Sequence, residues 1–280
     1  VSFESGLGCR LTDTHGKSYI DFLSGIAVSS LGHSHPNMVA SLSRQVEKLL
    51  HVSNLYTIPE QERAAALLVE MCGGERLNKA FFCNSGAEAN ECLLKMARRY
   101  AAEKGLPPTV TVFRDGFHGR TLATVSATGT PKYHEGFAPL MPGFIFADFN
   151  DLEGALEGLE ASCAVLLEPV QGEGGVIPAE EPFLQSLEEA CHKSDKLLLL
   201  DEVQTGVGRT GAWVAAHRYG VEPDAVSLAK GLGRGVAVGA VLARAELACL
   251  LPPGTHGTTF GGNPLASTAV RVVLETVAAE

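Results

Sequence analysis

The sequence predicts an α/β domain built on a mostly parallel β-sheet with helices on both faces. From residue 80 onward, short apolar runs alternate with longer stretches of helical period, and this alternation is typical of strands linked by crossover helices. One run, residues 197–200, consists of four leucines, as expected for a strand buried on both faces. The composition, 45% hydrophobic and 19% charged, is that of an ordinary globular protein.

The chain before residue 80 predicts a β-hairpin followed by two helices. Residues 13–16, Asp-Thr-His-Gly, are a turn signal between two strand-like segments that end near Asp21. Pro36 suits the first turn of a helix, and a second helix is expected over residues 60–71. Apolar residues at helical spacing mark the first helix; they are Met38, Val39, Leu42, Val46, Leu49 and Leu50.

The sheet itself is expected to have seven strands with helices between them. The strands are predicted at residues 80–83, 109–113, 143–147, 163–167, 196–200, 225–229 and 238–243. The helices are predicted at residues 87–104, 151–160 and 182–194. Ligands bind beyond the carboxyl ends of the strands in such sheets, so the residues that follow the strands are the first candidates for a site.

Charge, hydropathy and cysteine spacing exclude several classes of protein. A net charge of -10 without a Lys/Arg run argues against a nucleic-acid or anionic-membrane partner. The sequence has no run of about eighteen apolar residues, so no transmembrane helix is expected. The first ten residues lack the pattern of a secretory signal. Seven cysteines without a CxxC pair do not support a zinc ribbon or a thioredoxin site. We expect buried free thiols in a reducing cytoplasm.

The first polar strand end is the segment 84–87, Asn-Ser-Gly-Ala, which precedes a long helical pattern. Free N–H groups at the start of a helix bind anions such as phosphate, and small residues let the anion approach. The alternative is an ordinary helix start, in which Ser85 caps the first turn and Glu88 completes a capping box. On this segment alone the capping interpretation is preferred.

Two further strands end in charged residues. Asp201 and Glu202 follow the leucine run, and Lys230 follows the run at 225–229. A carboxylate at the end of a buried strand needs a compensating cation or solvent, so Asp201 either faces a cationic ligand or is solvated in a loop. Glu202 is either solvated or paired nearby. Lys230 is either a surface lysine or a half-buried amine with a lowered pKa, which would serve as a nucleophile.

Together these groups describe one ligand with a phosphate, a ring cation and an aldehyde. Pyridoxal 5'-phosphate (PLP) has all three, because its aldehyde condenses with a lysine and its pyridinium nitrogen needs an anionic partner. We therefore expect Lys230 and Asp201 to be the catalytic residues, with the amine of Lys230 at the aldehyde and the carboxylate of Asp201 at the ring nitrogen.

Longer motifs resemble those of the class III (ornithine-type) aminotransferases. Asp201 opens the segment DEVQTGVGRTG, and Lys230 follows in LAKG. The other matching segments are NSGAEAN (84–90), FHGRT (117–121), EPVQGEGG (168–175) and HGTTFGGNP (256–264). The resemblance implies the type I PLP-dependent transferase fold and a homodimer with shared active sites. It also implies a C-terminal small domain that is missing here, so we expect the chain to be a piece of a longer protein.

The same resemblance assigns roles around the cofactor. Ser85, Gly86 and Ala87 would hold the phosphate, Phe117 would stack on the ring, and Gln204 would contact the ring hydroxyl region. Stacking of an aromatic side chain on the ring supplies contact area and fixes the ring plane.

Four further residues are assigned to the substrate and to the partner subunit. Arg120 would bind a substrate carboxylate, for which its planar fork is suited. Glu173 would pair with an arginine of the C-terminal domain, Thr259 would reach the phosphate in the other subunit, and Thr258 would lie beside it on the substrate side.

The resemblance implies transfer of a terminal amine to 2-oxoglutarate. The segments GIAVSSLGHSHP and HVSNLY are similar to the acetylornithine subgroup, so N2-acetylornithine is the expected donor. The alternatives are ornithine, succinylornithine or 4-aminobutyrate as donor, or a truncated homologue that binds PLP without catalysis. The expected division is an N-terminal segment (1–40), a large PLP-binding domain (41–262) and the start of a connecting helix (263–280).

Three features need separate comment. His33 and His35 have the spacing of a metal-binding pair, but no third ligand is evident, so no metal site is expected. His118 in FHGRT is expected to be structural. After LAKGLG the chain reads Arg-Gly-Val-Ala-Val at residues 234–238, where the family usually has glycines and a proline. Arg234 and Ala237 are therefore expected to alter the loop beside the cofactor.

Overall fold

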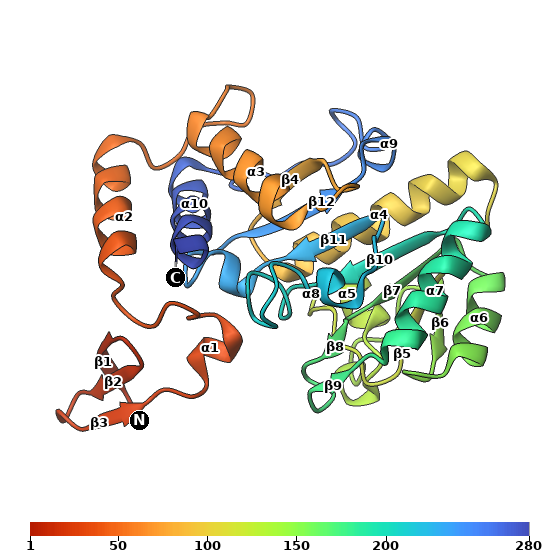
Figure 1. The fold of residues 1–280 in the computed structure, drawn as a ribbon, viewed down its shortest axis with the longest axis horizontal. Helices are drawn as coiled ribbons and strands as arrows, with labels where there is room; N and C mark the ends of the chain where they lie inside the picture. Colours follow the sequence, from red (N-terminus) through yellow and green to blue (C-terminus); the bar gives the residue numbers. More distant parts are fainter. Residues whose placement is uncertain (280) are drawn as a thin grey trace.

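A seven-stranded β-sheet forms the centre of the computed structural model, which describes residues 1–279 (Figure 1). Of these strands, only β12 runs antiparallel to its neighbours, β4 and β11. The mostly parallel sheet is therefore confirmed, and every predicted strand lies within one residue of its expected position. From one edge to the other the strands are β4 (Lys79–Cys83), β12 (Gly239–Ala243), β11 (Ala225–Leu228), β10 (Leu197–Asp201), β7 (Ala164–Leu167), β5 (Val110–Phe113) and β6 (Phe144–Ala147).

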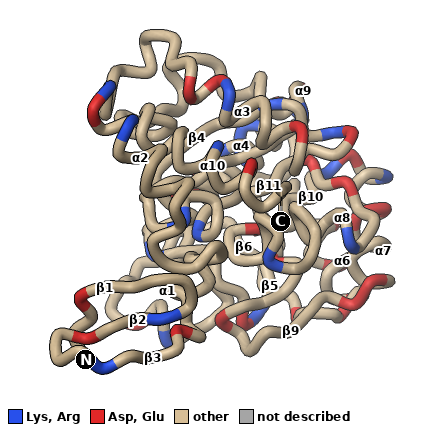
Figure 2. The backbone as a smooth tube through the Cα atoms, turned by 60° about the vertical axis from the view of Figure 1, so that its left-hand side comes forward, with Lys and Arg blue, Asp and Glu red and all other residues tan. Residues whose placement is uncertain are grey.

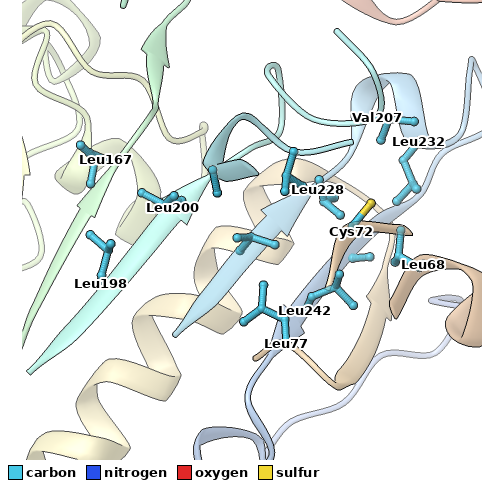
Figure 3. Close-up of a cluster of buried hydrophobic side chains, with 14 of the residues drawn as sticks. Leu68, Cys72, Leu77, Leu167, Leu198, Leu200, Val207, Leu228, Leu232 and Leu242 are labelled. Atoms are coloured by element: carbon cyan, nitrogen blue, oxygen red, sulfur yellow. The ribbon is translucent and has the colours of Figure 1, made fainter. Parts of the chain in front are cut away.

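The leucines of β10 fill both sides of the sheet. Leu197, Leu198, Leu199 and Leu200 are fully buried, and β10 lies between β7 and β11. Side chains alternate along a strand, so Leu198 and Leu200 belong to one hydrophobic cluster and Leu197 and Leu199 to the other. Figure 3 shows the first of these clusters. The strand is thus buried on both faces, as predicted.

Helices cover both faces of the sheet, as predicted (Figure 1). On one face lies α4 (Gly86–Lys104), which buries Leu93, Ala97 and Tyr100 against the cluster of Leu197 and Leu199. The other face carries α3 (Pro59–Cys72), α6 (Leu152–Glu160), α7 (Glu181–Lys193) and α10 (Pro264–Ala279). The predicted bounds of α3, α4, α6 and α7 are right to within one residue.

Shorter elements connect these layers. They are α1 (Ser24–Ala27), α2 (Pro36–Lys48), α5 (Leu122–Ala127), η1 (Pro131–Tyr133), β8 (Val170–Gln171), β9 (Ile177–Pro178), α8 (Ala215–Tyr219), η2 (Lys230–Leu232) and α9 (Ala245–Ala248). Within residues 1–279, no helix has the length and apolar character needed to span a bilayer. All seven cysteines are free, and five of them are buried.

The N-terminal segment forms three strands rather than the predicted hairpin of two. β1 (Phe3–Leu7), β2 (Arg10–Asp13) and β3 (Ser18–Ile20) make an antiparallel sheet, which stands apart from the central sheet in Figures 1 and 2. The predicted turn after Asp13 is present. The additional reversal between β1 and β2 passes through Gly8, whose φ of 55° is a left-handed conformation that favours glycine.

The apolar stripe of α2 is largely exposed, which differs from the expectation that helical spacing marks a buried face. Of the six apolar residues, only Met38 is buried and Leu42 is half-buried. Val39, Val46, Leu49 and Leu50 are 45% to 52% exposed. Spacing shows that a helix has an apolar face, but within residues 1–279 most of this face is left exposed.

Truncation of a leucine in β10 should destabilise the fold strongly. Leu199→Ala removes buried methyl groups and leaves a cavity, so we expect the free energy of unfolding to fall by about 2–5 kcal/mol. Leu199→Met conserves volume and should cost less than about 1.5 kcal/mol. Urea unfolding followed by circular dichroism measures both values. Equal losses for the two variants would contradict the tight packing of Leu199.

Candidate active site

One cavity of about 430 Å³ lies beyond the carboxyl ends of the parallel strands. It is lined by Ser85, Gly86, Ala87, Phe117, Arg120, Glu173, Asp201, Gln204 and Lys230. These are all of the residues that the sequence analysis assigned to a site, except Thr258 and Thr259. A second cavity of about 450 Å³, between α4, β4 and α9, contains none of them. The fold therefore gathers the predicted polar residues at one point.

The start of α4 offers both a helix cap and an anion site. The Oγ of Ser85 accepts the N–H of Glu88 at 3.2 Å, and the carboxylate of Glu88 accepts the N–H of Asn84 at 2.6 Å. The capping interpretation is thus confirmed for Ser85, although Glu88 reaches Asn84 instead of closing the box on Ser85. The N–H groups of the first helical turn have no partner within a helix, and Gly86 and Ala87 line the cavity. The two interpretations are compatible.

Glycine is required at position 86. A Cβ placed on Gly86 would lie 2.8 Å from Cγ1 of Val203, so a larger residue would push apart the helix start and the loop that follows β10. The close packing brings backbone N–H groups of α4 to the same cavity as Asp201. This is the arrangement in which a phosphate and a cationic ring nitrogen of one ligand could be bound together.

Asp201 is 3% exposed and is surrounded by donors. Its Oδ2 accepts hydrogen bonds from Nδ2 of Asn90 at 2.7 Å and from Nδ1 of His118 at 2.8 Å. Its Oδ1 accepts the N–H of Val203 at 3.0 Å. The interpretation of Asp201 as a solvated loop residue is wrong. The carboxylate is instead a preorganised anion at the wall of the cavity.

His118, which the sequence analysis treated as structural, is the immediate partner of Asp201. Burial disfavours the charged imidazole, but the hydrogen bond and the charge of Asp201 outweigh this effect and raise the pKa of His118. The imidazole therefore supports the negative charge of Asp201 from the side away from bulk water. Its position directly after Phe117 in FHGRT was the available signal.

Glu202 is fully buried but belongs to the scaffold. Its carboxylate accepts the N–H groups of Ala215 and Ala216 at 2.9 and 2.8 Å and the hydroxyl of Thr205. It thereby caps the start of α8. The suggestion that Glu202 is solvated is wrong, and the suggestion that it is paired nearby is confirmed. The contact fastens the loop that carries Gln204.

Lys230 is half-buried at the end of β11 and has a φ of 41°. Burial lowers its pKa, while the negative charges of Asp201, Glu173 and Glu168 oppose the shift. The surface-lysine interpretation is therefore wrong. An amine with a lowered pKa is more readily deprotonated and is a better nucleophile toward a carbonyl carbon.

Arg120 lies on an aromatic pair at the rim of the cavity. Its guanidinium carbon is 3.9 Å from the ring centre of Tyr133 and 5.3 Å from that of Phe117. The two rings meet edge to face, with centres 5.6 Å apart. Stacking orients the planar fork and leaves its N–H edges available for a carboxylate. Sequence reasoning missed Tyr133, for which the segment 131–133 carries no signal.

Gln204 and Glu173 both line the cavity. A Cβ on Gly172 would lie 2.2 Å from Oε1 of Gln204, so glycine at position 172 makes room for the amide. Gly235, Val236 and Ala237 also line the cavity. Arg234, which was expected to alter this loop, does not line the cavity.

Thr258 and Thr259 lie outside the cavity. The Oγ1 of Thr258 accepts hydrogen bonds from Nδ2 of Asn84 and from the N–H of Gly261, both at 3.1 Å. Thr258 lines a separate hollow of about 360 Å³, and Thr259 is exposed. Thr258 thus contacts Asn84, at the start of the segment 84–87, but neither threonine lines the cavity of its own chain.

Glu168 is a buried carboxyl group that the sequence analysis did not assign. It is 6% exposed, lines the cavity, and accepts the N–H of Phe117 at 2.8 Å and that of Gly172 at 3.2 Å. Burial, reinforced by the charge of Asp201, raises its pKa to about 7. Glu168 thus links the aromatic wall to the loop of Glu173.

The residues present fit pyridoxal phosphate. The first turn of α4 offers N–H groups to a phosphate, the buried carboxylate of Asp201 suits a pyridinium nitrogen, and Lys230 offers an amine for an aldehyde. The three lie on the wall of one cavity of about 430 Å³. The chemistry of the residues therefore matches all three functional groups of the cofactor.

Because the pKa of Glu168 is raised, the unfolding free energy of the chain should depend on pH in a specific way. Its pKa is 4.5 in the unfolded chain and about 7 in the folded one, so the folded state binds more protons between these values and is destabilised as pH rises. In Glu168→Gln this contribution is absent. The difference in unfolding free energy, wild type minus variant, should therefore fall from pH 5 to pH 7 and level off above it. Urea unfolding of the cofactor-free chain tests this, and a difference that stays constant with pH would contradict it.

Comparison with known proteins agrees with this site. The family described as Aminotransferase class-III matches residues 1–280. The chain is 50% identical over 279 residues to the acetylornithine aminotransferase of Aquifex aeolicus, covering 99% of this chain and 74% of that protein. It is 50% identical to the succinylornithine transaminase of Citrobacter koseri, covering 97% of this chain and 67% of that one.

A solved structure shows the same fold. The ornithine aminotransferase of Toxoplasma gondii, whose structure has PLP at partial occupancy in the active site, is 38% identical with a TM-score of 0.94. The match covers 100% of this chain and 67% of that one. The fold is thus the predicted type I fold of PLP-dependent transferases, and the cofactor of this cavity is PLP. The chain belongs to the class III aminotransferases, a family of PLP-dependent transaminases.

Proposed function

We propose that this protein transfers the terminal amine of N2-acetylornithine to 2-oxoglutarate, a step of arginine biosynthesis. The observation that carries the proposal is the convergence of Lys230, Asp201 and Arg120 on one cavity. The 50% identity to an acetylornithine aminotransferase over nearly the whole chain supports the choice of donor.

We assign the cofactor contacts as follows. When bound, PLP supplies an aldehyde that accepts an amino group and a ring that takes up the electron pair left by loss of a proton. The backbone of Gly86 and Ala87, with Ser85, would hold the phosphate, and Asp201 would keep the ring nitrogen protonated. Phe117 would fix the ring plane, and Gln204 would bind the ring hydroxyl.

Lys230 would handle the proton in the reaction. With the donor bound, the Nζ of Lys230 would be a free amine beside the amine-bearing carbon of the donor. It would accept the proton from this carbon and return it on the cofactor side, as a general base and then a general acid. The lowered pKa of Lys230 suits this role, because the neutral amine is more readily available.

Arg120 would bind the carboxylate of the donor and of 2-oxoglutarate, with Glu173 nearby on the cavity wall. Succinylornithine is retained as an alternative donor, because the chain is equally similar to a succinylornithine transaminase. Ornithine and 4-aminobutyrate differ from these donors by an acyl or carbon unit. Pockets discriminate such differences weakly, by roughly 10–200-fold for one methylene.

A second copy of the chain would complete the site. Thr258 and Thr259 lie outside the cavity of their own chain, and we propose that Thr259 reaches the phosphate in the partner subunit. The exposed apolar residues of α2, together with Leu55 at 91% and Tyr56 at 68% exposure, would form part of the dimer interface. We also propose a cytoplasmic location, supported by the seven free cysteines.

The donor is tested with the purified chain, PLP and 2-oxoglutarate. We expect glutamate formation to be fastest, in kcat/KM, with N2-acetylornithine among the four candidate donors. Lys230→Ala is the negative control. It should reduce turnover to background, and its circular dichroism spectrum should show that the fold is intact. Bleaching of the visible cofactor band by a donor distinguishes catalysis from binding alone. A band that responds to no donor would favour the non-catalytic alternative.

Arg120→Lys should impair binding of carboxylate donors selectively. Lysine keeps the charge but loses the planar fork and the stacking on Tyr133. We expect KM for N2-acetylornithine to rise about tenfold, the factor given by ~1.4 kcal/mol. Steady-state kinetics with a primary amine that has no carboxylate is the control, and its KM should change little. An equal loss with both amines would mean that Arg120 acts through packing.

A further inference from the structure

Asn90, the last residue of the NSGAEAN segment, connects four separate parts of the site. It lies on α4 one turn beyond the phosphate-binding turn and is 1% exposed. Its side chain contacts Asp201 after β10, His118 after β5 and Ser227 on β11. None of the roles assigned above involves this amide.

Every hydrogen-bonding group of the amide is used. Nδ2 donates to Oδ2 of Asp201 at 2.7 Å and to the carbonyl oxygen of His118 at 2.8 Å, which accounts for both of its hydrogens. Oδ1 accepts the hydroxyl of Ser227 at 2.7 Å. A buried side chain with all of its partners in place is held in one orientation.

Two groups that can only accept, the carboxylate of Asp201 and the carbonyl of His118, fix the orientation of the amide, and the Ser227 hydroxyl is compatible with it. This hydroxyl has one hydrogen, and Oδ1 of Asn90 at 2.7 Å is a better acceptor than Oδ1 of Asp201 at 3.4 Å. A flipped amide would set its oxygen against the carboxylate of Asp201 and the carbonyl of His118. Since acceptors repel one another, the flip is unfavourable, and the nitrogen of Asn90 must face Asp201.

The consequence is an asymmetric carboxylate at Asp201. Its Oδ2 receives two short hydrogen bonds, from Asn90 and His118. Its Oδ1 receives one from the backbone of Val203, so acceptor capacity is left on Oδ1. Asp201 lines the cavity, and Oδ1 is therefore the oxygen free to accept a proton donor of a ligand.

We propose that Asn90 is a positioning residue that orients the carboxylate of Asp201 so that Oδ1 meets the ring nitrogen of the cofactor. The inference rests on the proposed role of Asp201. As a neutral amide, Asn90 donates to the carboxylate without cancelling its charge, so the full negative charge stays available to the ring. His118 alone could hold Oδ2, but only the amide ties Asp201 to the helix that binds the phosphate.

The test is a pH titration of the absorbance of bound PLP in the purified chain. Asn90→Leu keeps the approximate volume and removes all three hydrogen bonds. We expect its titration midpoint to move in the same direction as that of Asp201→Asn, by about 0.3 pH units or more. The dissociation constant of PLP should rise about tenfold, as expected for buried groups left without partners. The titratable groups that face Asp201 are His118, Glu168, Glu202 and Lys230, and all are unchanged in this variant.

Two variants keep the test decisive. Ser227→Ala removes only the hydroxyl that donates to Oδ1 of Asn90, and it should shift the midpoint in the same direction by less. Asn150→Ala is the matched control, because Asn150 also makes two hydrogen bonds, to Pro178 and Glu180, far from the cavity lining. It should leave the midpoint unchanged even if it lowers stability.

The outcomes separate this inference from the proposed function. If Asp201→Asn shifts the midpoint but neither Asn90→Leu nor Ser227→Ala does, Asn90 has no positioning role. If Asp201→Asn leaves the midpoint unchanged as well, the assignment of Asp201 itself is wrong. Should Asn90→Leu fail to fold, Ser227→Ala decides alone, and its unchanged midpoint would overturn the inference.

Discussion

The structure depends on holding one ionised carboxylate at the end of a fully buried strand. Four leucines place Asp201 where only 3% of its surface is exposed, and an unpaired charge there would cost several kcal/mol or more. The protein compensates with donors from three directions, namely an amide, an imidazole and a backbone N–H. These donors stabilise the charge of Asp201, and its Oδ1 keeps acceptor capacity toward the cavity.

Helix α4 contributes both to the support of this carboxylate and to the proposed phosphate site. Its first turn presents N–H groups at Gly86 and Ala87, and its second turn supplies Asn90. Further along, Leu93 and Ala97 pack into the cluster of Leu197 and Leu199. Because one rigid helix carries all three functions, the distance between the anion site and Asp201 is set by the hydrophobic core.

Sequence reasoning predicted the sheet well because apolar runs and turn residues are local signals. Strand ends pointed to the segment 84–87, Asp201 and Lys230, whereas Phe117, Arg120, Gln204 and Glu173 came only from the resemblance to the class III aminotransferases. Sequence reasoning missed the contacts of His118, Glu168 and Asn90, which join residues 28 to 111 positions apart. The motif FHGRT marks the position of His118 but does not show that its imidazole faces Asp201. The spacing of apolar residues likewise predicted the helix α2 but carries no information on what covers its apolar face.

The cavity has a buried floor and an exposed rim. The floor, with Asp201 and Glu168, is nearly inaccessible to solvent, and its hydrogen bonds allow few substitutions. The rim carries Arg120, whose guanidinium is exposed and held by stacking on Tyr133. Stacking tolerates small lateral shifts that a buried hydrogen-bond network does not.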